Sequence, residues 1–323
     1  MKVNSNRDIS FKSVYTNKAL KKTFEFASKK PALTAASASV GFSLLRPFSI
    51  WLTPNTDAEN RKLACAKSVT SSLLNFGLML GISYPIDNAI KKIDNSPEKY
   101  LKKDTIDFYK QGAKSINASK RYLFASQLFK LGIMSVVAVP KAIMTAAAIP
   151  LIIKLLDFKS KKNPDNQKNI NFRGKSNLAS KVGKTLDKDG VKNFSDKYKD
   201  SNFVMHIIAL TDALSTLTFI AQTKKSKKIK EERKSALIYN AGISTGMCIG
   251  SGYVVDKLLE KPAEKFIQNY KKANISEKNL EKQVQGIKII KPLLILGTIY
   301  YMIIPFLSTY LAEITDKKGF FNK

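Results

Sequence analysis

The sequence predicts an all-α protein, a multi-pass transmembrane bundle of six to seven helices built from two pseudo-repeats that a Lys-rich polar linker joins. Three observations predict this fold. Runs without a charged residue cover 68–86, 235–255 and 292–312, and about 20 such residues suffice for a helix to cross roughly 30 Å of hydrocarbon. Two of these runs end in the same residue pattern. The connectors between the apolar segments are dense in lysine.

The repeated pattern, G-x3-G-x2-Y-x2-D, is the evidence for duplication. It occurs twice, 169 positions apart, as Gly77, Gly81, Tyr84 and Asp87 and again as Gly246, Gly250, Tyr253 and Asp256. Glycines four residues apart lie on one helix face, where they let a neighbouring backbone approach closely or form a hinge or thin-walled path. The tyrosine and aspartate that follow are either an interface anchor with a solvated charge or a pair that faces a substrate.

These features divide the chain into four parts. Residues 1–30 form a polar basic segment that ends in a short amphipathic helix, either interfacial or a lead-in to the next helix. The first membrane repeat is 31–157, the mobile basic linker 158–202 and the second repeat 203–323. Helices are expected near 32–55, 66–92, 121–139, 142–157, 203–223, 235–260 and 287–313.

The segment 122–156 is too long for one membrane span. A straight helix of this length would extend beyond the hydrocarbon by about 20 Å, so we expect two short spans that turn at Pro140-Lys141. With this hairpin, 38 Lys and Arg fall on one side of the membrane and 13 on the other, whereas a single span gives 27 and 24. The positive-inside rule then places the protein in the cell membrane with a cytoplasmic N-terminus.

The charge of the chain bears on its partners. Lys and Arg number 55 against 25 Asp and Glu, for a net charge of +30, and only six of the 55 are arginine. Few arginines argue against specific nucleic-acid recognition, which usually depends on bidentate guanidinium contacts. Lysines suit a bilayer partner and its anionic lipid head groups, although an AT-rich genome would give the same Lys/Arg ratio.

Residues for catalysis or metal binding are scarce. Cys65 and Cys248 form no C-x-x-C pair, and His206 is the single histidine. Neither a metal site nor a nucleophile–histidine arrangement has the residues it needs. We therefore expect no metal, no cofactor and no enzymatic activity.

Arg46 and Asp212 are the candidates for an intramembrane polar site. Each interrupts the first apolar segment of its half, and a charge at this depth generally requires a partner or a water-filled cavity. We expect them to pair or to share one polar cavity at the centre of the bundle, as a structural ion pair or as part of a translocation site, unless these helices lie too shallow in the membrane to need a partner. Two functions then fit the sequence: transport of a small solute through the two-repeat bundle, or a non-catalytic membrane scaffold whose Lys-rich cytoplasmic face binds anionic lipid or an acidic partner.

Overall fold

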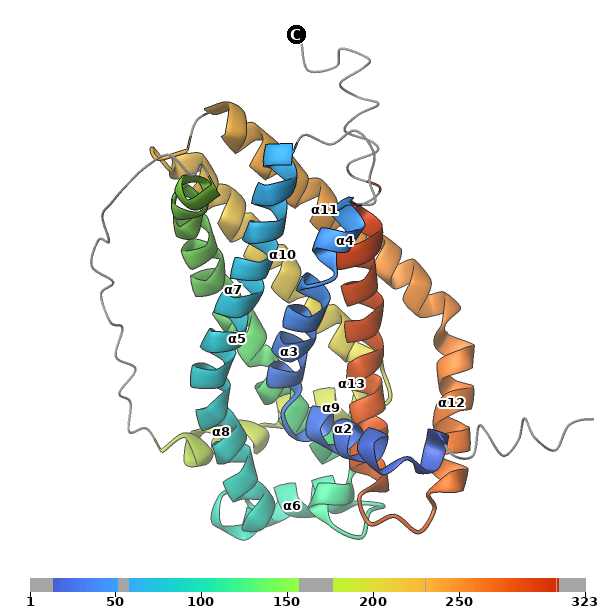
Figure 1. Cartoon of the computed structure of the whole chain (residues 1–323). Helices are drawn as coiled ribbons and strands as arrows, with labels where there is room; N and C mark the ends of the chain where they lie inside the picture. Colours follow the sequence, from blue (N-terminus) through green and yellow to red (C-terminus); the bar gives the residue numbers. More distant parts are fainter. Residues whose placement is uncertain (1–13, 52–57, 157–176, 230, 306, 308–323) are drawn as a thin grey trace, which may run out of the picture.

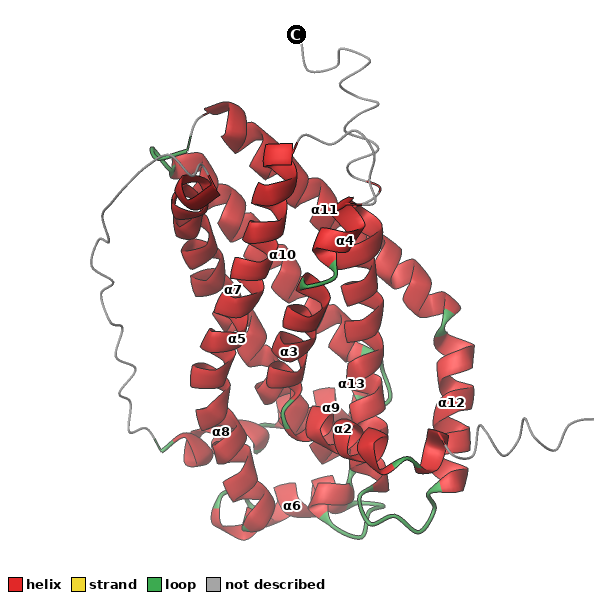
Figure 2. Ribbon diagram, in the orientation of Figure 1, coloured by secondary structure: helices red, strands yellow, loops and turns green. Residues whose placement is uncertain are grey.

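A computed structural model of the chain describes residues 14–51, 58–156, 177–229, 231–305 and 307 (Figure 1). These residues form helices and loops, with no strand among them (Figure 2). The helices are α2 (Lys18–Lys29), α3 (Pro31–Ser43), α4 (Arg46–Trp51), α5 (Ala58–Asn95), α6 (Lys103–Lys110), α7 (Lys120–Leu156), α8 (Leu178–Leu186), α9 (Asp189–Tyr198), α10 (Phe203–Lys225), α11 (Glu231–Leu258), α12 (Glu260–Ala273) and α13 (Leu280–Thr298), which continues as the π-helix η3 (Ile299–Ile303). The predicted all-α class is confirmed for the described residues.

The long helices α3, α5, α7, α10, α11 and α13 pack side by side around one main core. Helix α7 lies between α5 and α10, while α13 packs against α2, α3 and α11. The core is built from small and aliphatic side chains that these helices bury, among them Ala36, Met79, Leu131, Met205, Ile289 and Leu296. Alanines on α3 allow it to approach its neighbours closely, as expected for a segment rich in small residues.

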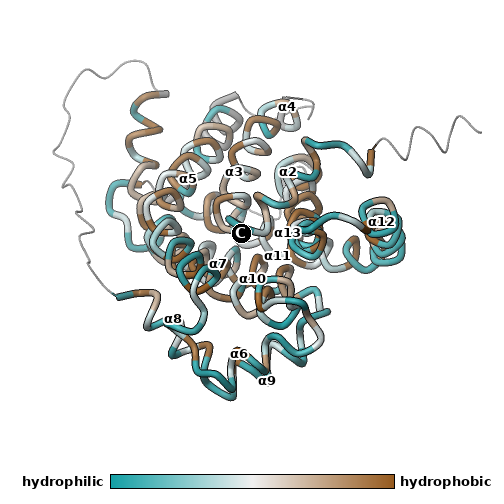
Figure 3. Tube along the Cα trace, turned by 90° about the horizontal axis from the view of Figure 1, so that it is seen from below, coloured by the Kyte–Doolittle hydropathy of each residue, from teal (hydrophilic) through white to brown (hydrophobic). Residues whose placement is uncertain are grey.

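Short helices gather at one end of the bundle, which we call the α6 end; it holds α2, α6, α8 and α9, with α12 beside it (Figure 1). Helix α4 lies at the opposite end, the α4 end. Seen from the α6 end, the short helices α6, α9 and α12 are largely hydrophilic (Figure 3). Four helices of the described part are long and apolar enough to cross a membrane: Cys65–Asn95, Lys120–Leu155, Phe203–Lys225 and Leu280–Ile303. Six to seven were expected, and α11, whose charge-free run contains four glycines, is not among the four.

The long helices of each half run in the same order of directions. Helices α5 and α7 are antiparallel, because Ser71 contacts Thr145 and Asp94 contacts Tyr122. Helices α7 and α10 are parallel, because Phe124 contacts Phe203 and Ser135 contacts Thr211. Helices α10 and α11 are antiparallel, because Asn202 contacts Asp256 and Thr216 contacts Thr245. In each half the chain thus leaves the α6 end, returns to it and leaves it again. As a result, α7 ends at the α4 end although α8 begins at the α6 end (Figure 1).

The expected hairpin at Pro140-Lys141 is wrong, because α7 is one helix of 37 residues that contains Pro140 and Pro150. Proline in a helix interior costs about 3 kcal/mol or more. Packing on both sides of Pro140 offsets this cost: Ser135 bonds Thr211 of α10, whereas Thr145 bonds Ser71 of α5. The continuous contact with two neighbouring helices holds the two parts of α7 in line.

Two other expectations need correction. The first apolar segment is two helices, since α3 ends at Ser43 and α4 starts at Arg46. The expected mobile linker is helical in its second part, where α8 buries Ala179, Val182 and Leu186 on one face. These spacings of three and four residues are typical of an amphipathic helix, but the lysines between them hid the pattern. The first part of the expected linker, 157–176, lies outside the described residues.

Candidate functional site

A pocket of about 470 Å³ opens at the α6 end, between α7, the α9–α10 turn, α11, α12 and α13. One side is apolar, with side chains from α7 and α10 that include Phe124, Leu128, Leu131, Phe203 and Ile207. The other side is charged. It carries Asp200, Asp256, Glu260 and Glu264 against Lys199, Lys257, Lys288 and Lys291. Four acids and four lysines balance, so this pocket is neutral in a chain of net charge +30.

Asp256 of the repeated motif lies in the pocket wall. Its Oδ1 is 2.9 Å from Lys291 Nζ of α13, with both side chains mostly buried. Its Oδ2 accepts a hydrogen bond from the Asn202 amide, at the start of α10. Lys291 also donates to the Asp256 carbonyl at 3.3 Å. Asp256 therefore ties together three helices that line the pocket, α10, α11 and α13.

Tyr253, one turn before Asp256, also lines the pocket and joins α11 to α10. Its hydroxyl is 2.7 Å from Nδ1 of His206, and the two rings lie 5.5 Å apart. His206 itself is exposed. The histidine thus positions a tyrosine of the pocket wall, which is the packing role that its isolation in the sequence favours.

Three polar side chains of the pocket form no hydrogen bond or ion pair with any residue that the structure describes. Gln127 of α7 is 4% exposed, and its Nε2 is buried with no hydrogen-bond partner. Gln285 of α13 is equally buried and makes no hydrogen bond to the described residues. Lys288, one turn further along α13, is half-buried and forms no ion pair within the described ranges, although the charges of Asp200 and Glu281 act on it. A buried donor without a partner, such as Gln127 Nε2, is costly, so this part of the pocket is suited to a hydrogen-bond acceptor of a ligand.

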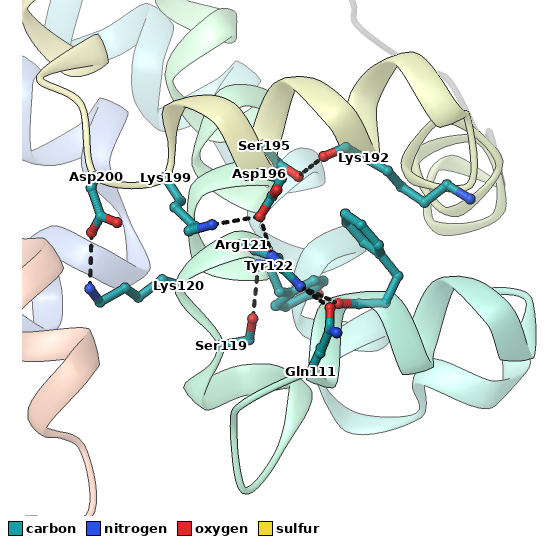
Figure 4. Close-up of polar contacts among 11 residues, drawn as sticks. Gln111, Ser119, Lys120, Arg121, Tyr122, Lys192, Ser195, Asp196, Lys199 and Asp200 are labelled. Carbon is teal, nitrogen blue, oxygen red and sulfur yellow. Dashed lines mark hydrogen bonds and ion pairs between the residues drawn. The ribbon is translucent and has the colours of Figure 1, made fainter.

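A polar network holds the α9–α10 turn that forms one wall of the pocket (Figure 4). Arg121, near the start of α7, pairs with Asp196 of α9, and Lys199 pairs with the same carboxylate at 2.5 Å. Beside them, Lys120 pairs with Asp200 at 3.0 Å. Hydrogen bonds from Lys199 and Arg121 lower the pKa of Asp196. The turn is therefore anchored to α7 by charges that are present at neutral pH.

The first copy of the motif does not reach this pocket. Tyr84 is exposed, and Asp87 of α5 feels the charges of Lys130 and Lys30 instead of lining a described cavity. Each motif aspartate nevertheless lies near a lysine of the third long helix of its half, Lys130 on α7 or Lys291 on α13.

The expectation that the motif glycines pack against other helices is wrong. A Cβ atom added to any of them would meet no atom within 4 Å, which holds for Gly77, Gly81, Gly246 and Gly250. These glycines point outward, so close helix packing is not the reason for the shared pattern. The tight contacts are made by glycines outside the motif: a Cβ at Gly286 would overlap the backbone of Phe24, and one at Gly297 the ring of Phe42.

The expected pairing of Arg46 with Asp212 is not formed. Arg46 begins α4 at the α4 end, where its guanidinium carbon lies 5.4 Å from the ring centre of Tyr300. Asp212 lies on α10, and the charge that acts on it is that of Lys141. The cause is the geometry of the halves, because the continuous α7 places Lys141 beside α10 and supplies Asp212 with a nearer cation.

The sequence indicated only part of the pocket. Tyr253 and Asp256 were found through the repeat, whereas Asn202, Gln127, Gln285, Lys288 and Lys291 were missed. Lys291 precedes the last charge-free run directly, which was the one available signal. In the described parts of the chain, no group of three or more His, Cys, Asp or Glu residues could hold a metal ion, and both cysteines are free.

Comparisons with protein-family models, with curated proteins and with solved structures gave no match for this chain.

Proposed function

We propose that this chain is a multi-pass membrane protein of the transport class, which takes a small dipolar solute with an apolar body into the pocket at the α6 end. The observation that carries this proposal is the pocket itself, in which an apolar wall faces unpartnered polar groups. Ligand sites are typically mostly apolar clefts of 300–1,000 Å³ with a few polar groups that fix orientation. The pocket has this size and this composition.

The balance of charge narrows the solute. Lys288 with the two buried glutamines suits a carboxylate or another acceptor group, whereas Glu260 and Glu264 at the rim suit an ammonium group. A solute that carries both a negative and a positive group is attracted by the lysine and by the glutamates, whereas a solute with a single charge is repelled by one of these two groups. Phe124 and Leu131 would contact its apolar body.

Two further features support the transport class. Four helices have the length and composition to cross a membrane, and exposed apolar residues such as Leu73, Val136 and Leu217 lie on the flanks of these helices. The halves also run in the same order of directions, as do the halves of transporters that are related by an axis along the membrane normal.

Thermal unfolding of the purified protein in detergent tests the proposal. The probes are the dipeptide Leu-Leu as the dipolar solute, and decanoate and decylamine as single-charge solutes. We expect Leu-Leu to raise the melting temperature most, since a ligand at 100 times its Kd stabilises the folded state by about 2.7 kcal/mol. The variants Gln127→Leu and Lys288→Gln should lose the shift, and Lys114→Gln, an exposed lysine of the same end, should keep it. The absence of a shift with every probe would contradict solute binding.

A membrane scaffold is the second candidate function, and the charge at the α6 end favours it. The short helices there expose lysines to the surroundings, including Lys22, Lys110, Lys184, Lys188, Lys261 and Lys265. Each lysine near an anionic surface contributes about 1 kcal/mol to binding. Salt-sensitive binding to phosphatidylglycerol vesicles, without a solute-dependent shift in melting temperature, would favour the scaffold over the transport class.

A further inference from the structure

A buried cation with no counter-charge among the described residues lies at the α4 end, far from the solute pocket. Arg46 is 9% exposed, and its Nε is buried with no hydrogen-bond partner. Arg46 forms no hydrogen bond or ion pair with any residue that the structure describes. Its guanidinium carbon lies 5.4 Å from the ring centre of Tyr300. A guanidinium has five donors, so a buried arginine in this state is unusual.

The charge of a second cation, Lys67, interacts with that of Arg46. Lys67 of α5 places its Nζ 3.9 Å from the ring centre of Phe219, and within the described ranges it has no acidic partner. The charge that acts on Lys67 is that of Arg46, which has the same sign. Contacts with aromatic rings stabilise both cations in part, but they do not neutralise them. The positive charges of buried Arg46 and half-buried Lys67 therefore repel each other across α4 and α5.

Hydroxyl groups accompany the two cations. The Tyr301 hydroxyl is 2.9 Å from Ser39 Oγ and 3.2 Å from Ser72 Oγ. Tyr301 also feels the charge of Arg46. Hydroxyls can donate to an oxyanion without adding negative charge, so the surroundings of Arg46 offer further donors and no competing carboxylate among the described side chains.

We propose that Arg46 and Lys67 bind a phosphate group at the α4 end of the bundle, a site separate from the solute pocket. The planar guanidinium matches the oxygens of phosphate in a bidentate manner, and lysine adds a point charge. A phosphate would supply the missing acceptor for Arg46 Nε and remove the repulsion between the two cations. Since the site lies at an end of the bundle, the phosphate comes either from a lipid head group or from solution.

Melting temperatures in a phosphate-free, uncharged detergent test this site at constant ionic strength. The probes are inorganic phosphate, phosphatidylglycerol and diacylglycerol, which has the same tails without the phosphate. We expect stabilisation by at least one phosphate probe and none by diacylglycerol. Stabilisation by inorganic phosphate assigns a free anion, and stabilisation by phosphatidylglycerol alone assigns a head group.

Variants separate binding from a structural role. Arg46→Gln and Lys67→Gln should each abolish the shift, whereas Lys62→Gln, an exposed lysine on α5, should keep it. Without phosphate, Arg46→Gln should melt no lower than the wild type, because it removes an uncompensated cation. If the Arg46→Gln variant does not fold, the melting temperature of Lys67→Gln alone decides the test. The proposal is overturned if no phosphate probe stabilises the wild type, or if both variants keep its shift; the solute pocket is unaffected by either result.

Discussion

Asp256 is the residue that joins most elements around the pocket, because its carboxylate holds Lys291 of α13 and Asn202 of α10 together. Its side chain is 15% exposed and that of Lys291 21%, so the pair is intermediate between an exposed ion pair, which contributes about 0.2–1 kcal/mol, and a buried one, whose breaking costs about 3–5 kcal/mol. This partly buried interaction thus contributes to holding α10, α11 and α13 together around the pocket.

We predict that Asp256→Asn lowers the free energy of unfolding by about 1–3 kcal/mol, since Lys291 loses its counter-charge. The double variant Asp256→Asn with Lys291→Met should recover part of this loss, because no unpaired charge is left. Chemical denaturation in detergent measures both. Asp107→Asn, a change at an exposed aspartate, is the control, and an Asp256→Asn protein as stable as this control would refute the role of the pair.

Asp196 is a second single residue that holds the pocket, because it anchors the α9–α10 turn. Its pKa lies below the ordinary value of 3.8 because Lys199 and Arg121 hydrogen-bond the carboxylate. A lowered pKa in the folded state contributes stability above the unfolded pKa, and this contribution is lost as the pH falls through the folded pKa. The anchoring of the turn should therefore weaken only below about pH 4.

We predict that the melting temperatures of wild type and Asp196→Asn differ at pH 5 to 7 and converge as the pH falls below 4. The measurement is thermal unfolding across pH 3 to 7 for both proteins. A difference that stays constant through this range would show that the Asp196 charge does not anchor the turn.

At the scale of the elements, glycine positions separate helix contacts from exposed faces. Gly286 lets α13 approach the backbone of α2 at Phe24, and there a side chain has no room. Gly246 on α11 has open space around it. The same substitution at the two sites should therefore act in opposite directions.

We predict that Gly286→Ala destabilises the protein by about 1–3 kcal/mol or more, as overpacking does. Gly246→Ala should be neutral or stabilise by up to about 1 kcal/mol, because alanine is the better helix former. The free energies of unfolding of the Gly286→Ala and Gly246→Ala variants test this prediction. Gly77→Ala, a change at a second glycine with open space around it, should behave like Gly246→Ala. Equal losses at Gly286 and Gly246 would mean that α11 packs against another surface through its glycines.

The elements also show how far the sequence could be read. Charge-free runs indicated α5, α11 and α13 because apolar composition over 20 residues is a strong signal. The continuity of α7 through Pro140 could not be predicted, since it depends on Ser71 and Thr211 on two other helices. In the pocket, Asp256 was visible as part of a repeat, but its partner Lys291 was not, because tertiary contacts pair residues that no sequence spacing links.

At the scale of the whole molecule, the parallel course of α7 and α10 has a consequence for a membrane. The segment 157–177 joins opposite ends of the bundle, and its sequence holds six Lys and Arg. Such residues are costly within hydrocarbon. The hardest requirement for a membrane-spanning bundle is therefore that α7 crosses the whole bilayer and ends at the α4 end, although the next helix, α8, lies at the α6 end.

Labelling of single cysteines in intact cells with a membrane-impermeant maleimide tests this arrangement most directly. The background replaces Cys65 and Cys248 with serine, and the reporters are exposed lysines: Lys114→Cys and Lys184→Cys at the α6 end, Lys154→Cys and Lys227→Cys at the α4 end. We predict that the ends differ and that the two positions of each end agree: either 154 and 227 or 114 and 184 are labelled, and the other pair is protected until the membrane is permeabilised. Equal reactivity at 114 and 154 would contradict the complete crossing of α7, different reactivity at 114 and 184 would contradict the placement of α8, and equal reactivity at all four positions would contradict a membrane-spanning bundle.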